Sequence, residues 1–117
     1  MELPEKLVLH VPEEKWCVDH LESIASGHVL DELIGTLENA GVISLYSQNA
    51  MGFYKGRCYH EILFTIFCEN QARAKTVAEI FGDWFRTHNA VLKQEAFAYE
   101  WNGTLHIRTL ERGGEQP

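Results

Sequence analysis

Residues 57–88, RCYHEILFTIFCENQARAKTVAEIFGDWFRTH, carry two clear structural patterns. Apolar side chains occupy most even-numbered positions from 58 to 68, which is the alternation of a strand with one buried face. Apolar side chains then recur every three or four residues up to His88, which indicates an amphipathic helix with Asn70 as its N-cap. The sequence therefore predicts a strand over 57–68 that is followed directly by a helix over 70–88.

Weaker patterns toward the N-terminus predict further elements. The run Leu7–Val11 predicts a first strand that ends at Pro12, and the spacing of the next apolar residues predicts a helix over 12–25. The following apolar set is half a turn out of phase with that helix, so a separate helix is predicted over 26–41. A strand over 42–48 and a glycine-containing loop over 47–57 complete this part of the chain.

The C-terminal part is predicted to be a hairpin that turns at Asn102-Gly103. The order of elements is that of a split β-α-β unit, so we predict an α+β fold: a ferredoxin-like sandwich with an additional C-terminal hairpin strand. Its helices should cover one face of an antiparallel sheet. We expect residues 1–110 to form a single domain and residues 111–117 to form a flexible tail.

The hairpin turn also fixes which side chains share a face. Pairing outward from the turn sets Trp101 opposite Thr104, Tyr99 opposite His106 and Phe97 opposite Arg108, all on one side. The other side carries small and aliphatic residues, which suit the contact with covering helices. We therefore expect the aromatic side to lie on the open face of the sheet; the alternative is that the faces are inverted and these rings belong to the core.

Exposed aromatic rings imply a covering partner. That partner is expected to be a second copy of the chain, or a planar or anionic ligand that stacks on the rings and binds Arg108. The predicted loop over 47–57 adds Tyr54, Lys55 and Arg57, which could surround a phosphate or carboxylate. An ordinary hairpin tip with solvated cations explains the same residues.

Composition excludes several classes of protein. The net charge of −7 arises within residues 1–40, and the only basic stretch, at 55–57, is too short for a nucleic-acid binder. No apolar run is long enough to span a bilayer, which leads us to expect a cytoplasmic protein that binds neither nucleic acid nor membrane. The three cysteines lack paired spacing and are expected to be reduced thiols.

Candidate chemistry is sparse. Cys17 and His20 lie three residues apart, but a buried thiol beside a surface histidine explains them better than a nucleophile or half of a metal site. His60 and His106 are the candidates for a general base. His60 could meet His88, but buried neutral histidines that bond to the backbone explain these two residues better. No metal and no cofactor are predicted.

Residues 33–66 contain the segments ENAG, VISLYS, FYKG and EILFTI in the order helix, strand, hairpin loop and strand. This layout resembles the small trimeric regulatory families related to PII and the divalent-cation-tolerance proteins. The resemblance covers about a third of the chain and carries over no binding residue. It implies ligand sensing or oligomeric assembly.

Three functions follow as hypotheses. The leading one is a non-enzymatic homo-oligomer that binds a small ligand or a protein partner, in a regulatory role, through the open sheet face and residues 47–57. The second is a cofactor-free enzyme of the dimeric α+β-barrel type, with His60 or His106 as general base. The third is an acidic inhibitor that docks on a basic protein through residues such as Glu13, Glu14 and Asp19.

Overall fold

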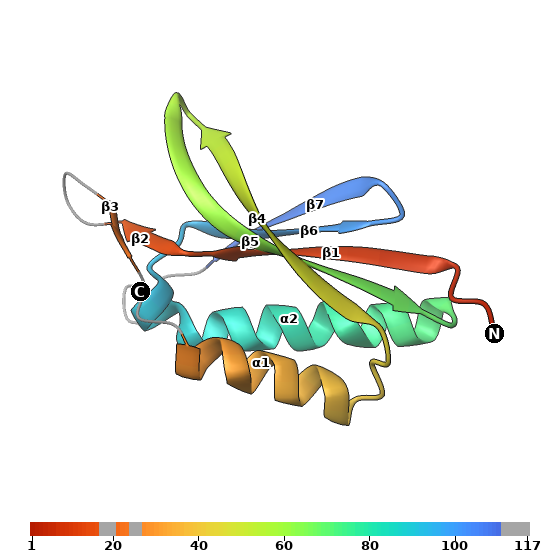
Figure 1. Cartoon of the computed structure of the whole chain (residues 1–117). Helices are drawn as coiled ribbons and strands as arrows, with labels where there is room; N and C mark the ends of the chain where they lie inside the picture. Colours follow the sequence, from red (N-terminus) through yellow and green to blue (C-terminus); the bar gives the residue numbers. More distant parts are fainter. Residues whose placement is uncertain (17–20, 24–26, 111–117) are drawn as a thin grey trace.

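A computed structural model describes residues 1–16, 21–23 and 27–110 (Figure 1). The described elements are β1 (Glu5–Pro12), β2 (Glu14–Trp16), β3 (Leu21–Ser23), α1 (Gly27–Asn39), β4 (Leu45–Tyr54), β5 (Arg57–Cys68), α2 (Gln71–Leu92), β6 (Ala96–Trp101) and β7 (Thr104–Thr109).

Five of these strands form one sheet in the order β4-β5-β1-β6-β7, and every neighbouring pair is antiparallel. The central strand β1 pairs with β5 on one side and β6 on the other, which is the strand order of a split β-α-β sandwich with β7 added at the edge. Both helices lie on the same side of the sheet (Figure 1). The predicted fold class is confirmed.

The core lies between the sheet and α2. Leu7, Leu9 and Val11 alternate along β1 and are almost completely buried, and Phe81 and Phe85 cover them from α2. The two helices are joined by a hydrogen bond that Trp84 Nε1 donates to the Val29 carbonyl at 3.0 Å.

Local sequence signals explain how the helices begin and end. The Asn70 side chain accepts a hydrogen bond from the Arg73 amide at 2.8 Å and caps α2, as predicted. After α1, Gly41 adopts a positive φ of 96°, and the Val42 amide donates to the Leu37 carbonyl at 3.1 Å. This bond belongs to a Schellman motif, so the predicted helix end at Gly41 is correct.

The C-terminal hairpin has the predicted register but the opposite orientation. Leu9 of β1 is paired with Tyr99, so the two side chains share the face that packs on the helices. Tyr99 and Phe97 have exposed fractions of 8% and 4%, and the Phe97 ring stacks on Phe85 with centroids 5.4 Å apart. The prediction that these rings are exposed on the open face is wrong, because pairing with β1 determines the orientation of β6.

The other residues of that predicted aromatic face lie on the same, helix-facing side. Trp101 is half-buried, and its Nε1 donates to Glu5 Oε1 at 2.9 Å. His106 stacks on Tyr99 with ring centroids 4.9 Å apart, while Arg108 is exposed next to it on the edge strand β7. His106 and Arg108 therefore do not lie on the open face.

Two element predictions are also wrong. The segment predicted as a helix over 12–25 contains the short paired strands β2 and β3, while Cys17, Asp19, His20 and residues 24–26 lie outside the described part. The predicted loop over 47–57 consists mainly of paired strands, because β4 and β5 continue to the pair Tyr54 and Arg57 around a two-residue turn. In Figure 1 this hairpin end curls away from the helix layer.

Two further predictions concern the C-terminal tail and membrane-crossing segments. The predicted tail, 111–117, lies outside them. Neither α1 nor α2 combines the length and apolar character that a membrane-crossing helix requires.

Truncation of Phe97 tests the corrected orientation. We expect Phe97→Ala to lower the free energy of unfolding by about 3 to 5 kcal/mol, because it removes a buried ring and leaves a cavity. Leu105→Ala, which truncates a half-exposed side chain on β7, should cost about 0.5 kcal/mol. Urea unfolding measures both. Equal effects of the two substitutions would contradict the burial of Phe97 beneath α2.

Candidate functional site

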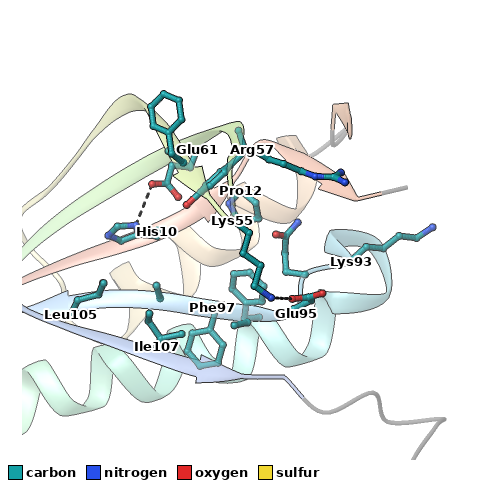
Figure 2. Close-up of a pocket in the computed structure, with 17 residues that line it drawn as sticks. His10, Pro12, Lys55, Arg57, Glu61, Lys93, Glu95, Phe97, Leu105 and Ile107 are labelled. Carbon is teal, nitrogen blue, oxygen red and sulfur yellow. Dashed lines mark ion pairs between the residues drawn. The ribbon is translucent and has the colours of Figure 1, made fainter. Parts of the chain in front are cut away.

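A pocket of about 740 Å³ lies on the sheet face opposite the helices, at the end where the β4–β5 hairpin curls over β6 and β7 (Figure 2). Ala96, Ala98, Leu105 and Ile107 provide an apolar lining from β6 and β7. In Figure 2, Leu105 and Ile107 extend from their strand toward the space beneath the hairpin. The volume falls in the range of roughly 300–1,000 Å³ that is typical of small-molecule sites.

His10 of β1 is the polar centre of this face. Its Nδ1 lies 3.2 Å from Glu61 Oε1 on β5, and its Nε2 lies 2.9 Å from Glu100 Oε2 on β6. His10 and Glu61 line the pocket, whereas Glu100 flanks the imidazole on its other side. A neutral imidazole carries a single N–H, so it is the protonated ring that donates to both carboxylates.

Electrostatics favour that protonated ring. The hydrogen bond with Glu61 raises the pKa of His10 most strongly; burial opposes this effect, and the hydrogen bond with Glu100 adds to it, so that the pKa lies above the ordinary value of 6.5. The Glu61 side chain is only 12% exposed, against 37% for Glu100. Glu61 is thus the better shielded of the two carboxylates and the one in contact with the pocket.

The hairpin side of the pocket combines an aromatic ring with several cations. The Tyr59 ring lies directly over Gly52, where an added methyl group would meet the ring at 2.5 Å. Lys55 reaches from the hairpin tip to Glu95, with 3.9 Å between Nζ and Oε2 (Figure 2). Arg57 and Lys93 extend away from the enclosed space (Figure 2). The His10 and Glu61 side chains, at 20% and 12% exposure, are by contrast well shielded.

The predicted site residues are divided between the two faces of the sheet. Lys55, Arg57 and Phe97 line the pocket, the last from its helix-facing side. Tyr54 is the strand partner of Arg57 at the hairpin end. The residues that line the pocket do not include the predicted site residues Tyr99, Trp101, His106 and Arg108.

The two candidate bases are not brought to the pocket. His60 occupies an even-numbered position of β5, on the opposite face from Glu61, and His106 stacks on Tyr99. His88 contacts Glu32 on α1 with 2.9 Å between Nε2 and Oε2, far from the open face. In the described ranges 1–16, 21–23 and 27–110, no group of three or more histidines, cysteines or acids is arranged to hold a metal.

Sequence reasoning missed His10, Glu61 and Glu100. The alternation of Leu7, Leu9 and Val11 was a usable signal, because it directs His10 to the other face of its strand. Their assembly depends on the pairing of His10 with Leu63 and Ala98, which sets both carboxylates diagonally across from the imidazole. That register is not encoded in any local pattern.

Comparison with known proteins gives structural neighbours. No family model matches the sequence, and no curated protein matches it. One similar solved structure is a phage SAM lyase in complex with S-methyl-5′-thioadenosine, with a TM-score of 0.61 and 13% identity over 92% of this chain and 91% of that chain. Another is a phage SAM lyase in the apo state, with a TM-score of 0.53 and 15% identity over 95% of this chain and 96% of that chain. At these identities the likeness shows a common fold.

The His10 interactions predict a pH-dependent stability. Because the pKa of His10 is raised by folding, its contribution is fully present below the ordinary pKa of 6.5 and is lost as the pH rises through the raised value. We expect the unfolding free energy of the wild type to exceed that of His10→Gln at acidic pH and this difference to shrink at alkaline pH. Urea unfolding across the pH range measures the difference.

The variant His106→Gln is the control, since it removes a histidine from the other face of the sheet. It should follow the pH dependence of the wild type. If His10→Gln and the wild type differ by the same amount at every pH, the imidazole does not carry the proton that its two carboxylate contacts require.

Proposed function

We propose that this chain is a cofactor-free lyase that binds S-adenosylmethionine in the open-face pocket and releases S-methyl-5′-thioadenosine. The observation that carries this proposal is the shielded carboxylate of Glu61, which lines a pocket otherwise rich in apolar side chains. The shared fold with phage SAM lyases, one of which is in complex with S-methyl-5′-thioadenosine, supports the choice of substrate. Of the functions predicted from sequence, this is closest to the cofactor-free enzyme.

The pocket suits the two halves of such a substrate. The faces of the adenine ring are aromatic and the methylthio group is apolar, and they match the lining from Ala98, Leu105 and Ile107 together with the Tyr59 ring. The sulfonium is a permanent cation that cannot donate a classical hydrogen bond, so a nearby carboxylate binds it through charge alone. Glu61 is the residue that we assign to this role.

The proposed reaction needs no external group. The bond between sulfur and the γ carbon of the methionine chain breaks, and its electron pair stays on sulfur, which becomes a neutral thioether. The substrate's own carboxylate oxygen bonds to that carbon and closes a five-membered lactone, so that charge and atoms balance without water or proton transfer. Holding the chain folded in this reactive conformation is the contribution expected from the protein.

The proposed reaction gives no role to the two histidines that were candidates for a general base. Ring closure by a carboxylate anion does not require a general base, so His60 and His106 have no step to perform in this scheme. Glu61 acts by binding and orienting the cation, and the apolar walls exclude water that would otherwise compete with the carboxylate for the γ carbon.

Self-association stays a prediction. The surface that now supports it is not the predicted aromatic face but the exposed apolar residues of the β4–β5 hairpin and β7. Phe53 and Met51 on the β4–β5 hairpin are 74% and 58% exposed, and Leu105 and Ile107 on β7 are exposed to a similar degree. Phe53, Leu105 and Ile107 also line the pocket, so a second copy on this face would enclose the site further. The regulatory role and the docking of a basic protein likewise remain predictions, and part of the acidic surface, Asp19 included, lies outside the described residues.

Product analysis tests the proposed activity. Incubation of the chain with S-adenosylmethionine should yield S-methyl-5′-thioadenosine and a four-carbon lactone in equal amounts, as measured by mass spectrometry. We expect Glu61→Gln to lower kcat/KM by about a hundredfold, because it removes the enclosed negative charge without a large change in shape. Glu38→Gln, on the exposed side of α1, should retain full activity.

Two results would contradict the proposal. Absence of any thioether product from the wild-type chain would exclude the activity itself. An unsaturated amino acid in place of the lactone would show that the bond between sulfur and the γ carbon breaks by elimination, with loss of a proton from the neighbouring carbon. That reaction requires a base, so this product would exclude the ring-closure route.

A further inference from the structure

His10 has no step in the proposed reaction, yet its imidazole directly contacts the proposed cation-binding carboxylate. Its imidazole bridges Glu61 and Glu100 at 3.2 and 2.9 Å, so in the empty site both carboxylates already have a cationic partner. A sulfonium that approaches Glu61 through the pocket therefore meets a second positive charge. The proton on His10 and the charge of the ligand compete for the same carboxylate.

We propose that His10 makes the pocket selective by charge: a sulfonium ligand binds with release of the imidazole proton, whereas a neutral thioether binds with the proton retained. This inference rests on the proposed function and deepens it. The substrate, a cation, would be favoured by the deprotonated site, and the neutral thioether product would leave a site that is free to take up a proton again. His10 is thus a specificity-determining residue rather than a catalytic one.

The surroundings of His10 leave few other groups to share this role. Glu61 faces it from β5 and Glu100 from β6, while the pocket residues of β7 are Leu105 and Ile107, which carry no charge. The remaining charged groups that line the pocket are Lys55 and Arg57 on the hairpin and Lys93 and Glu95 beyond α2. Lys55 is engaged with Glu95, and Arg57 and Lys93 extend outward (Figure 2).

Thermodynamic linkage fixes the direction of the effect. If a bound cation lowers the proton affinity of His10, the affinity for that cation must rise with pH by the same factor. A fall of one unit in the pKa of His10 on binding corresponds to about a tenfold gain in affinity between the protonated and deprotonated site. A ligand of equal shape without the charge gains nothing, because it does not displace the proton.

A matched pair of ligands isolates the charge. S-methyl-5′-thioadenosine is neutral, and its S-methylated derivative, a dimethylsulfonium nucleoside, differs from it by one methyl group and one positive charge. The derivative lacks the amino-acid chain and so cannot undergo the proposed ring closure. Isothermal titration calorimetry of both ligands at several pH values, in two buffers of different ionisation enthalpy, gives each affinity and the number of protons released.

We expect the sulfonium to bind about tenfold more tightly at alkaline than at acidic pH, with release of about half a proton at the pH where release is greatest, while the affinity of the thioether stays constant. His10→Gln should abolish the pH dependence for the sulfonium, and His106→Gln should preserve it. Because the wild-type proton count alone carries the result, the proposal remains testable even if His10→Gln fails to fold.

The outcomes separate the two proposals. If both ligands bind with the same pH dependence, or if the sulfonium binds without proton release, the charge-selective role of His10 is wrong while the proposed nucleoside site stands. If neither ligand binds at any pH, the proposed function itself fails and this inference fails with it.

Discussion

The alternation of side chains along the central strand β1 is the constraint on which both faces of this protein depend. Leu7, Leu9 and Val11 point into the core, where α2 covers them, and His10 points the other way between two carboxylates. Because β1 pairs with β5 and β6 at once, its register orients both neighbours. A slip by one residue would bury His10 under the helices and expose three core residues.

The two sides of the sheet therefore have different roles. The helix side carries the aromatic packing of Phe81, Phe85 and Phe97, which supplies hydrophobic stabilisation through buried rings. The open side is then free to hold an enclosed polar group, Glu61, within an apolar pocket. A shielded carboxylate on this side of the sheet suits the cation binding that we propose.

The sequence predicted those features that depend on local patterns. The strand around Phe64 and the helix that follows Asn70 are set by periodicity and capping, and the turn at Asn102-Gly103 fixed the pairing of β6 with β7. The orientation of that hairpin was predicted wrongly because it depends on its pairing with β1, which lies about ninety residues away in the chain. We expected the side of the hairpin that carries Ala and Leu to pack against the helices, because small and aliphatic residues leave room for helix side chains. The aromatic side of the hairpin packs there instead.

The site was harder to predict than the fold for the same reason. His10, Glu61 and Glu100 come from three strands that are distant in sequence, and each appears as an isolated polar residue until the register is known. The extension of β4 to Tyr54 was also missed, because its glycine and small residues are typical of loops. Gly52 in fact leaves the space that the Tyr59 ring occupies on the neighbouring strand.

We propose above all that the open face of the sheet, around His10, binds the nucleoside. Titration of the isotopically labelled chain with S-methyl-5′-thioadenosine, followed by NMR, tests it most directly. We expect saturable shifts of the His10 imidazole and of the amides of Ala98 and Ile107, with the exposed side of α1 around Glu38 unchanged. Shifts confined to the helix layer, or no saturable shift at all, would contradict it.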